Sequence, residues 1–529
     1  MAVFRIILIL IFLFPAALFG QTNRYVVFFK DKTNTPYSVD QPAEFLSSKS
    51  LDRRAKQNIG VTELDLPVNP AYVDQIRGMG ARTFFTSRWM NCVLVELGAD
   101  SVGTLQSLPM VSKVELAAPG TKLIGGRIKK LDNSTTVASA STAQLQQLGI
   151  DQMHSQGFNG ENISMAILDA GFPGVNSTLA FQHLFQNGQV KGTFDFVGNT
   201  GSVYQYDLHG TEVLSTIAAK MEGSYIGGAI AANFYLFVTE DASSEYRIEE
   251  YNWLFAAEKA DSAGVDIIST SLGYNEFDDP SMNYTVSEMD GKTTVITRAA
   301  TQALVSGMVV VCAAGNEGSL AWHFITAPAD AAGILSCGAV DINGLRVPFS
   351  STGPTADNRI KPDVVALGEA TAVIDDAGLI TSASGTSLSC PLIASLAAGV
   401  WQAYPQLSAK QVYDVIIKSG DQAYHPDNLR GYGLPNFEAI KKIVETVNIT
   451  IHPNPATEDE VTVTLRTPTN ESVTVTIYDC LGRTLSVSVV ATSLQYNPFE
   501  LSLSGLPPGI YLIHFKNQSF SKTVKLIKV

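Results

Sequence analysis

The stretch Ser384-Gly385-Thr386-Ser387-Leu388-Ser389-Cys390-Pro391 decides the fold, because here a polar turn leads directly into an apolar segment, residues 392–401. That segment carries no charged residue, which predicts a helix buried on every side. Pro391 suits the first turn of such a helix, where a missing backbone N–H costs little. Ser387 then lies at the helix start, where the positive end of the dipole favours an oxyanion. A simple Ser/Thr/Gly helix cap is the alternative interpretation.

Two other stretches point to chemistry at this serine. Residues 165–171 predict a short apolar strand that ends in the carboxylate of Asp169, and residues 209–217 place His209 at the start of another largely apolar helix. Asp, His, Ser is one of the known chain orders of a nucleophilic triad. In such a site the imidazole takes the serine proton, because a neutral hydroxyl is a weak nucleophile.

Four sequence blocks resemble the subtilase family of serine endopeptidases. Residues 169–171, 209–211 and 385–387 resemble its Asp, His and Ser signature blocks, and residues 309–316 resemble the block with the oxyanion-hole asparagine. The resemblance spans residues 142–445. It implies catalytic roles for Asp169, His209, Ser387 and Asn316.

The same resemblance implies a set of substrate-binding residues. Two segments would flank the primary specificity pocket and pair with an extended substrate by strand addition. Their residues are Ser271, Leu272, Gly273, Ala314 and Gly315.

Two positions depart from the family pattern. Glu212 stands where the family commonly has His, and residues 392–395 are Leu-Ile-Ala-Ser where it has His-Val-Ala-Gly. Neither position belongs to the triad. Sedolisins pair a Glu/Asp couple with Ser in the same fold, but they do not need His209 and carry Asp at the position of Asn316. The serine–histidine interpretation is therefore favoured.

Length, composition and charge limit the number of domains and the class of protein. A chain of 529 residues predicts two to four domains, and 45% hydrophobic with 16% charged residues indicates an ordered globular protein. The net charge of −14 is uneven: residues 142–445 hold 14 Lys/Arg against 33 Asp/Glu, or −19, whereas residues 1–141 carry +5. Such an acidic middle argues against nucleic-acid binding.

The cysteines favour buried thiols over a disulfide framework. They are odd in number and widely spaced, at Cys92, Cys312, Cys337, Cys390 and Cys480. A Cys312–Cys337 bridge is the alternative. No cluster has the spacing of a zinc site, so no metal-binding residue and no certain cofactor are predicted. The family resemblance leaves structural calcium open.

The N-terminal region predicts export and a separate domain. Residues 1–20, with Arg5 and an apolar run over 6–19, have the form of a secretory signal peptide. Residues 21–141 predict a small α+β domain followed by a linker, and their place before a subtilase-like domain resembles the family's inhibitory, fold-assisting propeptide. Strands are expected at 24–30, 93–97 and 111–115, helices near 45–57 and 70–79, and the maturation region within 119–142. An unrelated binding domain is the alternative.

The middle region, residues 142–445, predicts a doubly wound α/β domain. Continuous apolar runs suit parallel strands covered on both faces, and helical segments alternate with them. The runs are 234–238, 265–269, 308–312 and 334–337, with helices over 247–263 and 294–306. In this architecture functional side chains collect beyond the carboxyl ends of the strands, where Asp169 and Asn316 fall.

The last region, residues 446–529, changes to an alternating pattern with about seven strands, which predicts a small β-sandwich. Residues 452–455, 509–511 and 522–525 resemble the C-terminal sorting domain of type IX secretion. That resemblance implies the secretion machinery as a partner and a secreted or cell-surface protein exported across the outer membrane. A carbohydrate-binding or adhesive β-module is the alternative.

Together these features predict a secreted serine endopeptidase that hydrolyses peptide bonds through an Asp-His-Ser triad and an Asn-containing oxyanion hole. The expected partners are protein or peptide substrates, the chain's own propeptide as inhibitor, and the secretion machinery. Two other classes compete: an inactive subtilase fold serving as an adhesin, and a non-proteolytic esterase.

Overall fold

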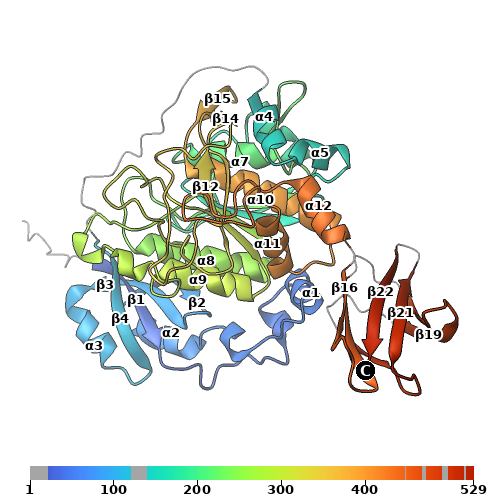
Figure 1. Cartoon of the computed structure of the whole chain (residues 1–529). Helices are drawn as coiled ribbons and strands as arrows, with labels where there is room; N and C mark the ends of the chain where they lie inside the picture. Colours follow the sequence, from blue (N-terminus) through green and yellow to red (C-terminus); the bar gives the residue numbers. More distant parts are fainter. Residues whose placement is uncertain (1–21, 121–139, 447, 467–471, 491–497, 518–519) are drawn as a thin grey trace, which may run out of the picture. The chain divides into compact units, whose positions relative to one another are not determined.

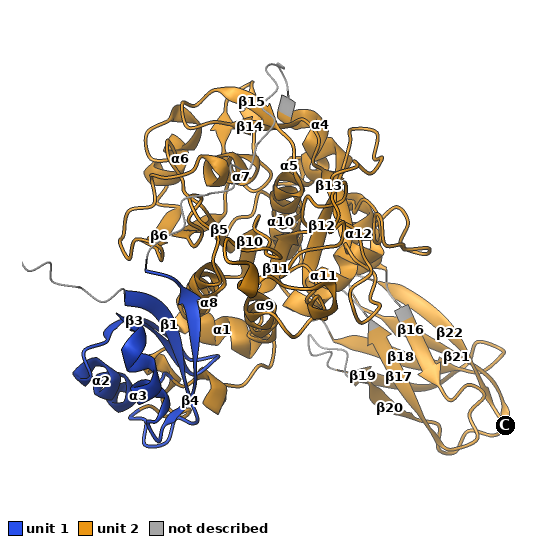
Figure 2. Ribbon diagram, turned by 90° about the vertical axis from the view of Figure 1, so that its left-hand side faces the viewer, with its two compact units in different colours: residues 1–36, 67–124 blue, residues 37–66, 125–529 orange. Residues whose placement is uncertain are grey.

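The computed structural model describes residues 22–120, 140–446, 448–466, 472–490, 498–517 and 520–529 (Figure 1). The chain forms two compact units, residues 1–36 with 67–124 and residues 37–66 with 125–529 (Figure 2). The predicted signal peptide and most of the predicted linker lie outside the described residues. In the part that is described, no helix is long and apolar enough to cross a membrane. The predicted boundaries of the four domains stay predictions.

The smaller unit is an α+β fold, as predicted. Its antiparallel sheet has the order β2-β3-β1-β4, and alternate strand residues such as Val27 and Val93 pack with Ile76 and Leu105 in one core. The sequence pattern missed strand β2. The elements are β1 Thr22–Phe29, α2 Pro70–Gly78, β2 Arg82–Ser87, β3 Cys92–Gly98, α3 Val102–Gln106 and β4 Val111–Ala118.

The larger unit contains a parallel sheet of seven strands in the order β13-β12-β11-β10-β5-β9-β6. This result confirms the predicted doubly wound α/β class. The first strand, β5, lies inside the sheet, with β9 and β6 on one side and β10 to β13 on the other, which creates a change of direction beside β5. The strands are β5 Ser164–Asp169, β6 Val190–Asp195, β9 Asn233–Val238, β10 Ile267–Thr270, β11 Val309–Ala313, β12 Leu335–Val340 and β13 Val364–Leu367.

Helices flank this sheet because its strands are apolar on both faces. Helix α10 packs on β10, β11, β12 and β13, while α8 and α9 pack together and against β5 and β11. Alternate strand residues, including Ile167, Val311 and Leu335, share one core with side chains of α7 and α10. The helices are α1 Ser48–Lys56, α4 Ala140–Gln147, α5 Ile150–Ser155, α6 Gln182–Gln186, α7 His209–Ala218, α8 Ile248–Ala263, α9 Val295–Val305, α10 Thr386–Ala403, α11 Ala409–Lys418 and α12 Phe437–Glu445.

Helix α10 is buried over its first sixteen residues, as the uncharged sequence predicts (Figure 1). It begins at Thr386, so Pro391 is its sixth residue and lies beyond the first turn. The prediction that placed Pro391 in the first turn was wrong, because the polar turn ends earlier than its composition indicates. The proline therefore removes an intrahelical hydrogen bond, and the partner of that bond is the carbonyl of Ser387.

The C-terminal strands form two sheets, β16-β17-β20 and β19-β18-β21-β22, around a shared apolar core. Val463, Ile477 and Phe515 are buried in that core, each at an alternating position of its strand. The strands are β16 Asn448–His452, β17 Glu460–Arg466, β18 Val473–Tyr478, β19 Thr484–Val490, β20 Phe499–Ser502, β21 Gly509–Lys516 and β22 Ser521–Lys528. The predicted β-rich C-terminal region is confirmed.

All five cysteines are free thiols, including Cys312 and Cys337. Four are buried, but Cys480 is exposed. Its predicted burial was wrong because Cys480 follows the last residues of β18, in a turn that Asp479 closes by accepting backbone hydrogen bonds from Leu481 and Arg483.

Candidate active site

Three neighbouring strands carry the candidate site at one edge of the parallel sheet. In the register Leu168 of β5 lies beside Thr270 of β10, and Thr270 lies beside Cys312 of β11. Asp169, the last residue of β5, and Ser271, the first residue after β10, therefore lie at the same carboxyl edge. This is the edge at which open α/β sheets place ligands.

Asp169 and His209 are hydrogen-bonded to each other. His209 Nδ1 lies 2.7 Å from Asp169 Oδ1, which also accepts a hydrogen bond of 2.8 Å from the backbone N–H of Ala170. Asp169 is fully buried, while the His209 side chain is 17% exposed. Gly210 permits this approach, since a Cβ there would lie 2.2 Å from the carbonyl oxygen of Gly171. The pair is therefore a buried carboxylate that orients a partly accessible imidazole.

Ser387 and Asn316 both lie close to Gly385. A Cβ on Gly385 would be 2.8 Å from Ser387 Oγ and 3.5 Å from Asn316 Nδ2, so only glycine leaves this space open. Asn316 Oδ1 accepts hydrogen bonds from the backbone N–H of Thr386 at 2.9 Å and from its hydroxyl at 3.0 Å. These two bonds fix the amide orientation and leave Nδ2 to donate beside the serine. Ser387 is the second residue of α10, at the positive end of its dipole.

Ser271 supports the start of α10 from the neighbouring strand. Its hydroxyl donates a hydrogen bond of 2.7 Å to the Ser387 carbonyl, the group that loses its helical donor at Pro391. The carbonyl would otherwise be buried without a partner, since Ser387 is 4% exposed. Ser271 therefore has a structural role in addition to the substrate-binding role that the sequence predicted.

The predicted substrate-binding segments face one residue that the sequence analysis missed. A Cβ on Gly273 would lie 2.2 Å from Thr326 Oγ1, and one on Gly315 would lie 2.9 Å from the same atom. The Thr326 backbone N–H donates to the carbonyl of Ala314, which holds the threonine in place. Leu272 is buried beside these positions. Only the chain fold brings Thr326 between the two glycines, so no sequence motif could have identified it.

Glu212 is a buried carboxyl group one helical turn after His209. It is 1% exposed, and burial raises its pKa to about 7 against the opposing effect of His209, with Asp207 adding to the rise. The Glu212 side chain is therefore partly protonated at neutral pH.

The other histidines of this region are structural or exposed, and the described residues give no metal site. His154 Nε2 lies 2.9 Å from the carbonyl oxygen of Gly228, and burial lowers the pKa of both His154 and His183. Within the ranges described, no three His, Cys, Asp or Glu side chains are grouped to hold a metal ion. No calcium site is assigned.

Comparison with known proteins decides the family. The sequence model of the subtilase family matches residues 160–433, which is half of the chain. The chain belongs to the subtilase family. A Bacteroidota S8 propeptide domain matches residues 24–152 of this subtilase, and a secretion system C-terminal sorting domain matches residues 450–529.

Several curated proteins resemble this subtilase over most of their length. Subtilisin DY of Bacillus licheniformis is 31% identical over 296 residues, which cover 55% of this chain and 94% of that protein. Subtilisin E of Bacillus subtilis is 29% identical, covering 56% and 70%. An alkaline protease of Shouchella clausii is 27% identical, covering 66% and 78%. The chain is thus a subtilisin-like serine endopeptidase with a propeptide and a sorting domain, and it is a secreted or cell-surface protein.

The Ser271 bond gives a first prediction. Ser271→Ala should lower the free energy of unfolding by about 1–3 kcal/mol, because the Ser387 carbonyl is left buried and unsatisfied. Urea unfolding of the full chain, followed by tryptophan fluorescence, measures the change. Adding Pro391→Ala restores a helical N–H for that carbonyl and should recover part of the loss. Equal stability of Ser271→Ala and the parent would contradict this role.

Glu212 gives a prediction on pH. Because its pKa is raised from 4.5 to about 7, the folded state binds the proton more tightly than the unfolded state between these values, and stability falls as pH rises through this window. Glu212→Gln removes this loss, so it should stabilise the protein by about 1–3 kcal/mol at pH 8 and change little at pH 4. Urea unfolding at both pH values tests this, with the exposed Glu161→Gln as the matched control. A gain of the same size at pH 4 would refute the linkage.

Proposed function

We propose that this subtilase hydrolyses peptide bonds through Asp169, His209 and Ser387, with Asn316 in the oxyanion hole. The observation that carries the proposal is the 2.7 Å hydrogen bond between Asp169 Oδ1 and His209 Nδ1. With Nδ1 engaged by Asp169, Nε2 is the nitrogen that would take the serine proton. A buried carboxylate on Nδ1 is the arrangement that holds a histidine in the base tautomer.

In the proposed mechanism His209 Nε2 accepts the proton of Ser387 as its Oγ attacks the substrate carbonyl. The imidazolium that forms is stabilised by Asp169, which is fully buried and therefore poorly screened by water. His209 then gives the proton to the leaving amine. Water repeats the sequence on the acyl-enzyme and releases the second product.

The negative charge of the tetrahedral intermediate would be held by two donors. Asn316 Oδ1 accepts two hydrogen bonds from Thr386, which orients the amide so that Nδ2 can donate to the oxyanion. The backbone N–H of Ser387 lies at the start of α10, so the helix dipole adds to its effect. Removing one side-chain donor of this kind costs roughly 3–4 kcal/mol in the transition state, a figure that was itself measured on a subtilisin.

Substrate would bind as an added strand along Ser271–Gly273 and Ala314–Gly315. Main-chain hydrogen bonds would supply affinity, and the pocket between the two segments would select the side chain. Thr326 lies between the two glycines of these segments, so its hydroxyl would contribute to this selection. The propeptide is proposed as the chain's own inhibitor, and the sorting domain as the part that the type IX secretion machinery binds.

The adhesin and esterase alternatives predict different behaviour. An adhesin on this fold would not react with a fluorophosphonate, whereas the proposed enzyme is labelled at Ser387. An esterase would be labelled but would leave casein intact. Labelling together with casein hydrolysis is the outcome expected for the peptidase.

The nucleophile gives the third prediction. Ser387→Ala should lower turnover by on the order of 10⁶-fold, the loss known for a triad serine in a subtilisin. Casein hydrolysis and fluorophosphonate labelling measure the effect. Ser384→Ala is the matched control, since its hydroxyl lies in the same turn and accepts a hydrogen bond from Ala370 N–H. A Ser387→Ala protein with a tenth of the parent activity would show that the assignment is wrong.

The oxyanion donor gives the fourth prediction. Asn316→Leu should lower kcat by roughly 10²–10³-fold and leave KM nearly unchanged, because Nδ2 acts mainly in the transition state. Steady-state kinetics on a peptide amide separates the two constants. Thr386→Ala is the control: it keeps the Asn316 donor and one of its two anchoring bonds but also removes the acceptor of the Gly315 N–H, so its loss in kcat should be much smaller. Parallel losses in kcat and KM for Asn316→Leu would indicate a displaced turn instead.

A further inference from the structure

Residues 37–66 lie in the propeptide match but form part of the unit that contains the peptidase fold. Helix α1 of this segment is anchored on the amino edge of the parallel sheet. Lys49 Nζ donates to Ser164 Oγ at 2.5 Å and to Asp266 Oδ2 at 3.1 Å. Ser164 is the first residue of β5 and Asp266 precedes β10. The six residues of β5 place this edge about 16 Å from Asp169.

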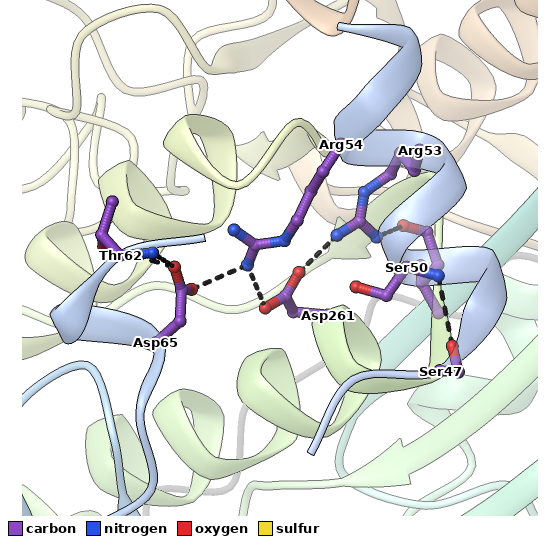
Figure 3. Close-up of polar contacts among 8 residues, drawn as sticks. Ser47, Ser50, Arg53, Arg54, Thr62, Asp65 and Asp261 are labelled. Carbon is purple, nitrogen blue, oxygen red and sulfur yellow. Dashed lines mark hydrogen bonds and ion pairs between the residues drawn. The ribbon is translucent and has the colours of Figure 1, made fainter. Parts of the chain in front are cut away.

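A buried network of ion pairs joins α1 to the end of α8. Figure 3 shows Arg54 between Asp65 and Asp261, with Arg53 on the other side of Asp261. Arg54 Nη2 lies 2.9 Å from Asp65 Oδ1 and 2.8 Å from Asp261 Oδ2, and Arg53 donates to Asp261 Oδ1 and to the carbonyl of Val265. The four charged side chains are at most 4% exposed. Two positive and two negative charges therefore balance within one buried cluster.

The segment stabilises the end of α8 because it supplies the partners of Asp261. Asp261 lies in the last turn of α8, where a negative charge opposes the helix dipole, and that turn contains no basic residue of its own. The two arginines of α1 supply the missing positive charge, and Ser47 N–H donates to the carbonyl of Ser262 at 2.9 Å. A buried carboxylate that loses such partners is strongly destabilising.

Gln57 closes the contact at the other end of α1. Its amide donates to the Gly307 carbonyl at 2.8 Å and accepts from the Ala409 N–H at 2.8 Å. Ala409 is the first residue of α11, so its N–H has no partner within the helix. Segment 47–57 thus satisfies backbone groups between β10 and β11 and at the start of α11, all away from the carboxyl edge.

We propose that residues 47–65 stay bound to the peptidase after the N-terminal region has been cut from it, as a structural element of the mature enzyme. The proposal rests on the proposed function, because it needs the cut that is expected within residues 119–142. The anchor lies at the sheet edge opposite Asp169, so the retained segment leaves the substrate-binding edge open. Its contacts are structural and do not require it to act as an inhibitor.

One experiment tests the anchor without using the activity of the protein. Full-length Ser387→Ala protein is digested with a trace of trypsin, and mass spectrometry follows cleavage after Arg53 and Arg54. Both bonds should be cut at least 10-fold more slowly than the bond after the exposed Arg77, because trypsin acts on the opened state. Asp261→Asn should speed the cleavage by on the order of 10²-fold. The control Asp414→Asn, which breaks an exposed pair with Lys410 in the same unit, should leave the rate unchanged.

A second experiment examines the mature enzyme itself. Secreted wild-type enzyme is blocked with a fluorophosphonate and purified by size exclusion without denaturant. Mass spectrometry of this sample should detect a fragment containing residues 48–56 at about one copy per peptidase chain. Size exclusion in guanidinium should then separate the fragment from the peptidase chain.

The outcomes separate the two proposals. Rapid cleavage after Arg53 and Arg54 in the parent, or no effect of Asp261→Asn, would overturn the anchor. An active mature enzyme without the fragment would overturn its retention and leave the proposed function standing. Absence of fluorophosphonate labelling and of casein hydrolysis would instead refute the proposed function, and the trypsin result would still decide the anchor.

Discussion

The burial of helix α10 is the constraint on which the site depends. Helix α10 is buried along its first sixteen residues, so its packing against β10, β11 and α7 fixes its position. The same packing therefore fixes the groups in its first turn. Pro391 interrupts this helix, and the Ser271 hydroxyl repairs the interruption from the adjacent strand. The serine turn is thus joined to the sheet by a side chain as well as by packing.

The parallel register brings the rest of the site to that helix. Asp169 ends β5 and Ser271 follows β10 at the same level, and Asn316 comes three residues after the end of β11. Each side chain was recognisable from its local motif because a strand end, a helix start or a glycine turn has a clear sequence pattern. Strands β5, β10, β11 and β12 were predictable because both of their faces are buried, which produces continuous apolar runs. Strand β6 is mostly half-exposed and was not predicted.

Other features depend on contacts that local patterns do not contain. Thr326 belongs to no motif, and it meets Gly273 and Gly315 only through the fold. Strand β2 was missed because its residues are mostly half-exposed and polar at several positions. Pro391 was placed too early because the helix begins inside a polar turn, and Cys480 was expected to be buried although a tight turn exposes it. Local motifs therefore located the candidate residues more closely than they set the limits of the helices and turns that carry them.

The anchor of α1 has a consequence for the order of folding. Its polar contacts with residues beyond position 66 join parts that are far apart in the chain, from 115 positions between Lys49 and Ser164 to 352 between Gln57 and Ala409. Non-local contacts of this kind offset the entropy of closing their loops only when the elements at both ends are in place. We therefore expect helix α1 to dock after β5, α8 and α11 have come together, although it leaves the ribosome long before they do.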